Sequence, residues 1–99
     1  MKMDYMTLYY VKLWHGDQVY YKIGRTTRTV KERFANEPQL HVIVLFAITF
    51  EYKIALKYER RLLRDYPAFK VAPGILKYGG FSEVYSKDIL ELDTVKIYR

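Results

Sequence analysis

Residues 7–34, TLYYVKLWHGDQVYYKIGRTTRTVKERF, decide the expected fold of this 99-residue chain. Apolar and polar side chains alternate along residues 5–14 and again along 19–24, which is the pattern of half-buried strands. Between them lies Gly16, and glycine readily takes the positive φ that a tight hairpin turn requires. The stretch therefore predicts an antiparallel hairpin that leads directly into a helix.

The helix after the hairpin is expected to begin with a threonine cap. Thr26 or Thr27 can accept hydrogen bonds from the free N–H groups of its first turn. Val30 and Phe34 recur at helical spacing and are predicted to face the core. Pro38 ends the helix, since the residue before a proline avoids helical geometry.

Further elements are expected along the rest of the chain. Residues 41–50, HVIVLFAITF, are rich in β-branched and aromatic residues and predict a central third strand. A second helix is expected over 52–66, followed by an irregular loop. A short strand is predicted at 81–85, a short helix capped by Ser86, and a final edge strand over 94–98.

Composition limits the class of protein. The length indicates one domain, residues 1–99. The net charge of +6 favours polyanionic partners, chiefly nucleic acid, although a basic soluble protein without such a partner is the alternative. The absence of cysteine excludes disulfides, thiolate zinc sites and a cysteine nucleophile, and fits a cytoplasmic location. The N-terminus lacks an apolar signal core, and no apolar run is long enough to span a bilayer as a helix, so no membrane association is expected.

The second expected helix carries an acidic residue among apolar ones. The apolar residues at helical spacing are Ala55, Tyr58, Leu62 and Tyr66. Glu59 falls on the same side, where an unpaired charge would cost several kcal/mol. One interpretation is a ligand for a divalent cation. The other is an ion pair, either with a helix neighbour such as Lys53, Lys57 or Arg60, or with a residue of the hairpin.

Several of these residues resemble a known family. The strings LY at 8–9 and KIG at 22–24 are similar to the two halves of the GIY-YIG nuclease signature. Arg33 and Glu59 match the arginine and the metal-binding glutamate of that family. The string YYKIGRTTRTVKERF is most similar to the T5orf172/MUG113-like branch, which also has a glycine-rich loop and a motif like GFSEVY at 80–85.

The resemblance implies a fold and an activity. The fold is a small α/β (α+β) domain with a mostly antiparallel, three-stranded sheet flanked by helices. The activity is Mg²⁺- or Mn²⁺-dependent endonucleolytic cleavage of DNA, with Glu59 as the metal ligand. Arg33 would hold phosphate oxygens through its planar guanidinium group. Tyr9 would be the general base, with Lys22 as the cation that lowers its pKa or as a phosphate ligand.

Basic residues outside this catalytic set are expected to bind the nucleic-acid backbone or to form a solvated surface. The expected nucleic-acid-binding residues are Arg25, Arg28, Lys57, Arg61 and Arg64. With a single domain, sequence specificity is expected to be low or modest, unless a homodimer or a partner protein supplies it.

Two other functions stay open. Many relatives keep a histidine near the position of Glu37 and a late asparagine, and this chain has no clear match for either. The alternative is therefore a catalytically weak or inactive protein of the same fold that binds or regulates nucleic acid. A protein-interaction factor that reuses the fold is the third possibility.

Overall fold

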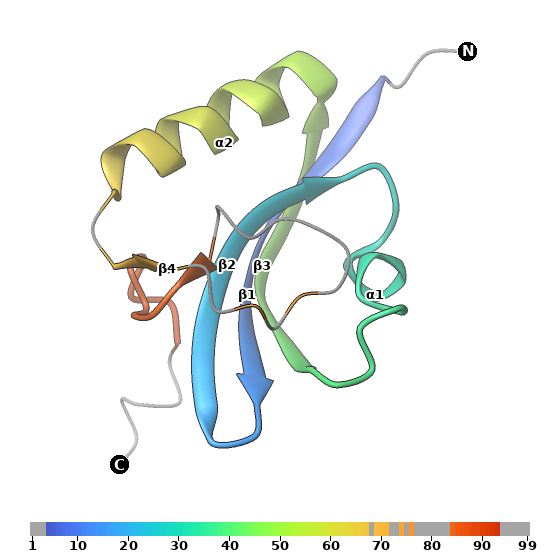
Figure 1. Cartoon of the computed structure of the whole chain (residues 1–99). Coiled ribbons are helices and arrows are strands. Elements are labelled where there is room, and N and C mark those ends of the chain that lie inside the picture. The colour runs from blue at the N-terminus through green and yellow to red at the C-terminus, as the bar shows by residue number, and fades with distance from the viewer. Residues whose placement is uncertain (1–3, 68, 72–73, 75, 77–83, 94–99) are drawn as a thin grey trace.

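The computed structural model describes residues 4–67, 69–71, 74, 76 and 84–93 (Figure 1). The described elements follow the order β1 (Tyr5–His15), β2 (Gln18–Thr26), α1 (Val30–Arg33), β3 (His41–Glu51), α2 (Tyr52–Asp65), β4 (Lys70–Val71) and β5 (Val84–Tyr85). All strand pairs are antiparallel, in the order β3-β1-β2-β5-β4. The α+β class is confirmed, but the predicted three-stranded sheet is wrong because the described residues form a sheet of five strands.

The hairpin forms as predicted and is the framework of the sheet. Its register pairs Tyr9 with Gly24 and Val11 with Lys22. Gly16 begins the two-residue turn with φ of 62°, and glycine is the residue that a type II′ hairpin turn requires at this position. The hairpin thus fixes which side chains of β1 and β2 share a face.

β3 lies at the edge of the sheet, so its predicted central position is wrong. It pairs with β1, and the register shifts at Tyr10/Val11, where the ladder is irregular. Val44 and Ile48 are about half exposed, at 47% and 49%. Residues 41–50 are mostly apolar, and an edge strand that packs against a helix shares this composition with a central strand.

The two faces of the sheet are covered by different helices (Figure 1). On the first face, Tyr9, Val11 and Leu13 pack against Val30 and Phe34 of the α1 region. On the second face the side chains belong to another buried cluster and contact the inner side of α2. That cluster contains Leu8, Tyr10, Tyr21, Ile23 and Tyr85, with Leu62 and Leu63 packed against it. Since side chains alternate along a strand, each face receives every second residue of β1 and β2.

The first helix is short and begins two or three residues later than expected. Thr29, rather than Thr26 or Thr27, is the cap, because its side chain and that of Glu32 form a reciprocal capping box. The Thr29 backbone N–H donates to Glu32 Oε1 at 2.9 Å, and this bond lowers the pKa of the Glu32 carboxyl. Val30 and Phe34 are buried, as predicted.

The second helix closely matches its predicted range, but its buried stripe differs. Ala55 and Glu59 are the fully buried positions, whereas Tyr58 and Tyr66 are 40% and 37% exposed. Tyr58 instead packs edge-on against Phe50 of β3, with ring centroids 5.0 Å apart. No helix among the described residues is long and apolar enough to cross a membrane.

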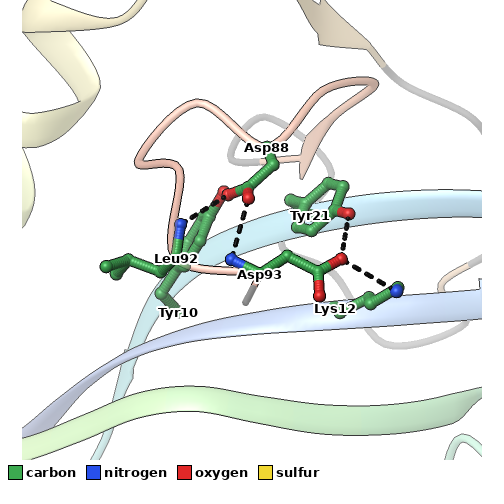
Figure 2. A network of polar contacts seen from close by, with 6 residues as sticks. All are labelled: Tyr10, Lys12, Tyr21, Asp88, Leu92 and Asp93. Carbon is green, nitrogen blue, oxygen red and sulfur yellow. Dashed lines mark hydrogen bonds and ion pairs between the residues drawn. The ribbon is translucent and has the colours of Figure 1, made fainter. Parts of the chain in front are cut away.

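A buried polar network holds residues 86–93 against the hairpin (Figure 2). The Tyr10 hydroxyl donates to Asp88 Oδ1, and the Tyr21 hydroxyl donates to Asp93 Oδ2, each at 2.7 Å. Lys12 Nζ lies 2.8 Å from the same Asp93 oxygen. Asp88 also accepts the backbone N–H groups of Leu92 and Asp93, at 3.3 and 2.9 Å.

This segment contains turns and no helix within 84–93, so the predicted helix capped by Ser86 is wrong. The Asp88 carboxylate accepts the backbone N–H groups of Leu92 and Asp93, which follow the turn at 89–90, and these bonds close a loop rather than begin a helix. Of the predicted strand at 81–85, residues Val84–Tyr85 form β5, and 81–83 lie outside the described residues. The predicted strand at 94–98 also lies outside them.

The network predicts that the protein loses stability in alkaline solution. Burial, and then the hydrogen bond to Asp88, raise the pKa of Tyr10, and burial with the Asp93 bond does the same for Tyr21. A phenol titrates near pH ~10 when unfolded. The contribution to stability is therefore complete below that pH and falls as pH rises above it, by up to about 1.4 kcal/mol per pH unit for each phenol. Urea unfolding between pH 8 and 11 measures this.

The matched variant for this measurement is the double substitution Tyr10→Phe and Tyr21→Phe. It is less stable at neutral pH but is expected to show a shallower alkaline loss. An alkaline loss equally steep in the variant would contradict the assignment to these two phenols.

Candidate functional site

Tyr9 and Lys22 lie together on the first face of the sheet. Tyr9 is 1% and Lys22 2% exposed. The ring of Tyr9 packs directly over Gly24, and the Lys22 ammonium lies 5.9 Å from the ring centroid. Lys22 Nζ also donates to the Ile23 carbonyl oxygen at 3.4 Å. The structure therefore brings these two predicted catalytic residues together, inside the protein.

Arg33 lies on the same face of the sheet as Tyr9, because its guanidinium contacts the Phe34 ring that packs against Tyr9. The Arg33 guanidinium carbon lies 5.0 Å from the Phe34 ring centroid, and that ring meets the Tyr9 ring edge-on with centroids 5.8 Å apart. Glu37, which sequence analysis gave no role, is 1% exposed and accepts from Gln39 Nε2 at 2.6 Å. Its place shortly after the end of the α1 turn offered no sequence signal that its carboxylate would be buried.

Glu59 lies on the second face and forms an ion pair with Arg25. Arg25 Nε donates to Glu59 Oε1 at 2.7 Å, and the side chains are 34% and 9% exposed. The ion pair with a hairpin residue, one of the alternatives for Glu59, is therefore the arrangement in this structure. Arg25 was expected to bind phosphate only, and its pairing with Glu59 depends on how α2 lies against the end of β2.

The predicted catalytic residues are thus divided between the two faces. Lys22 pairs in register with Val11 on the face of α1, whereas Arg25 pairs with Leu8 on the face of α2. Because side chains alternate along β2, Glu59 and its partner point away from Lys22. The structure assembles the Tyr9 group and the Glu59 group as separate clusters.

Basic side chains from the outer face of α2 line a groove of about 460 Å³. Its lining residues are Lys53, Leu56, Lys57, Arg60, Arg61 and Arg64. Three of the predicted nucleic-acid-binding residues therefore share one surface, and two further cations join them. These basic residues extend along α2 from Lys53 to Arg64, a length of about 16 Å at the helical rise.

Arg28, the remaining predicted nucleic-acid-binding residue, lies away from α2. It is exposed in the bend between β2 and α1, where its backbone N–H donates to Thr26 Oγ1 at 3.1 Å. Arg64 additionally has a neighbouring carboxylate, with its Nε 3.6 Å from Asp65 Oδ1. Both side chains of that pair are well exposed, so solvent screens the interaction and leaves Arg64 able to contact another anion.

The donor groups allow one kind of metal site. Within the described residues no group of three or more His, Asp or Glu side chains is placed to hold a metal ion. Mg²⁺ is often held by one or two carboxylates, with water and substrate phosphate completing its shell. Glu59 fits that kind of site by its chemistry, although Arg25 Nε already occupies its Oε1.

Comparisons with known proteins give no match: no family model matches the chain, and no curated protein or solved structure is found to be similar to it.

Proposed function

We propose that this protein binds nucleic acid, most readily DNA, through the sugar-phosphate backbone, and that the groove on the outer face of α2 is the contact surface. The observation that carries the proposal is the gathering of Lys53, Lys57, Arg60, Arg61 and Arg64 in one groove whose described lining contains no carboxylate.

The physical basis is electrostatic. Cations that approach the phosphates release condensed counterions, and this term supplies nearly all of non-specific binding. The basic residues of the α2 groove span the length of several successive phosphates. Their lysines offer point charges, and their arginines offer planar guanidinium groups. The asparagine and glutamine side chains that read adenine edges are missing from α2, so we expect modest sequence specificity.

The test is the salt dependence of binding, measured by fluorescence anisotropy with a labelled duplex between about 50 and 200 mM salt. The variant replaces Lys57, Arg61 and Arg64 by glutamine. Its plot of log affinity against log salt is expected to be shallower by about 2 to 3, at about 0.9 for each phosphate that the variant no longer neutralises.

The matched control removes the same charge elsewhere on the surface. Lys31, Lys70 and Lys87 are exposed and lie outside the α2 groove. Their replacement by glutamine is expected to leave the slope almost unchanged. Equal loss in the two triple variants would show that net charge, and not the α2 groove, causes the binding. Competition with single-stranded DNA and with RNA for the labelled duplex then ranks the affinities of the three nucleic acids.

A second candidate function is metal-dependent DNA cleavage. It is supported by the contact of Tyr9, Lys22 and Gly24, the residues on which the GIY-YIG resemblance rests. Glu59 would hold the Mg²⁺ or Mn²⁺ ion, which when bound supplies a Lewis acid for the phosphodiester. Tyr9 and Arg33, to which the resemblance assigns proton transfer and phosphate binding, lie on the opposite face of the sheet, so this hypothesis requires Glu59 and its ion to act without them.

The cleavage hypothesis predicts that Glu59→Ala lowers the rate of plasmid nicking by about 100-fold or more, while duplex binding is retained. Arg33→Ala, on the opposite face of the sheet, is the comparison, and an equal loss there would show that the two faces act together. The measurement is nicking in Mg²⁺ or Mn²⁺, with anisotropy on the same preparations. Equal nicking by wild type and Glu59→Ala would rule out the assigned role of Glu59.

A further inference from the structure

A pocket of about 320 Å³ lies between the C-terminal end of α2 and the loop of residues 86–93 (Figure 1). This α2-end pocket shares no lining residue with the α2 groove. The Ser86 backbone N–H donates to the Phe69 carbonyl oxygen at 2.8 Å, so the two segments that form the pocket are fixed to each other. The lining includes Asp65, Tyr66, Phe69, Lys87, Ile89 and Glu91.

Two aromatic rings of the α2-end pocket are open to solvent. Tyr66 is 37% and Phe69 53% exposed. Phe69 has a positive φ of 66°, and Glu91 has one of 54°. Residues other than glycine avoid this conformation, and it is retained where the surrounding structure requires a side chain in a particular place. The backbone therefore presents the Phe69 ring at the surface instead of packing it into the core.

The charges of this pocket are mainly acidic, although the whole chain carries +6. Asp65 and Glu91 present exposed carboxylates, and among the described residues Glu91 forms no ion pair. Asp88 also lines the pocket, but it is buried and already accepts three hydrogen bonds. The ammonium in the described lining is that of Lys87, whose Nζ lies 5.0 Å from the Phe69 ring centroid.

The Lys87 contact indicates the kind of ligand that the Phe69 ring attracts. The face of an aromatic ring is the negative part of its quadrupole, and it attracts a cation within about 6 Å of the centroid. A guanidinium suits the pocket better than an ammonium for two reasons. Its plane stacks on an aromatic face, and its forked N–H groups match a carboxylate.

We propose that the α2-end pocket binds an arginine side chain of a partner protein. The guanidinium stacks on the Phe69 ring and donates to the carboxylates of Asp65 and Glu91. Ile89 contacts the aliphatic stem of the arginine. In the free protein Lys87 covers the ring face, and the incoming guanidinium displaces it. The pocket and the α2 groove have opposite charge and separate linings, so a basic partner protein and a nucleic acid can be bound together.

The test is a titration of the full chain with N-acetyl-arginine methylamide, followed by the NMR shifts of backbone amides. Shifts are expected at Phe69, Ile89 and Glu91. The citrulline analogue has nearly the same shape without the charge, and it is expected to bind about threefold or more weakly. Free arginine, which adds a carboxylate and an ammonium, is expected to bind no more tightly than the blocked compound.

Three variants test the assigned contacts. The double variant Asp65→Asn and Glu91→Gln is expected to bind the arginine compound about threefold or more weakly. Lys87→Gln is expected to bind it more tightly than wild type, because the competing ammonium is gone. The matched control is Asp17→Asn, an exposed carboxylate in the hairpin turn, which is expected to leave the affinity unchanged.

Equal binding of the arginine and citrulline compounds by the wild type would overturn the proposal, and this comparison needs no variant. So would undiminished binding by the double variant, or an equal loss in Asp17→Asn. Lys87→Gln with unchanged or weaker binding would reject the displacement. Tighter binding of free arginine would reject a protein segment as the ligand in favour of the amino acid.

Discussion

Replacing Asp93 by alanine is expected to destabilise the protein by about 3–5 kcal/mol, because the change leaves the Lys12 ammonium buried without this carboxylate. The Lys12 side chain is 11% exposed and its Nζ lies 2.8 Å from Asp93 Oδ2. The Tyr21 hydroxyl loses the same acceptor. Urea unfolding monitored by circular dichroism measures the loss.

The double substitution Lys12→Met and Asp93→Leu is the control. Removing both charges leaves no uncompensated ion, so the double variant is expected to be more stable than Asp93→Ala, although both variants lose the Asp93 acceptor of the Tyr21 hydroxyl. A double variant as unstable as Asp93→Ala would contradict the assignment of the loss to the unpaired ammonium.

Gly24→Ala is expected to cost about 1–3 kcal/mol or more, because the new methyl group would overlap a buried ring. A Cβ at this position would lie 2.5 Å from Tyr9 Cζ, and Tyr9 is 1% exposed. The ring must then shift within the cluster that it shares with Val11 and Phe34. Thermal unfolding gives the size of the effect.

The Tyr9→Leu background provides the control for Gly24→Ala. A smaller side chain removes the overlap, so adding the alanine to Tyr9→Leu is expected to cost less than adding it to wild type. Gly16→Ala provides a second comparison, since its added Cβ meets nothing within 4 Å and its cost comes from the positive φ. An equal cost of Gly24→Ala in both backgrounds would show that Tyr9 is not the obstacle.

The elements with strong local signals could be predicted from the sequence. The alternation in 5–14 and 19–24, with Gly16 between them, predicted the hairpin. The apolar residues at helical spacing before Pro67 predicted α2. The number and order of strands could not be predicted, because β4 and β5 have two residues each and depend on their neighbours. The edge position of β3 also depends on pairing, about which its apolar composition contains no information.

For the site, residue types could be predicted more readily than partners. The inward position of Glu59 followed from helical periodicity, and its burial is confirmed. Its pairing with Arg25 depends on how α2 crosses the hairpin, a tertiary relation that no local pattern contains. The opposite faces of Lys22 and Arg25, in contrast, follow from alternation along β2, but the predicted strand ended at Gly24 and left Arg25 outside it.

The network in Figure 2 also has a consequence for the order of events during synthesis. Tyr10 is made 78 residues before Asp88, and Tyr21 is made 72 residues before Asp93. A hairpin emerging from the ribosome therefore carries two phenols and an ammonium whose acceptors do not yet exist. Completion of the α2 face must wait for residues 88–93, so a chain stalled before them should remain sensitive to proteases on that face.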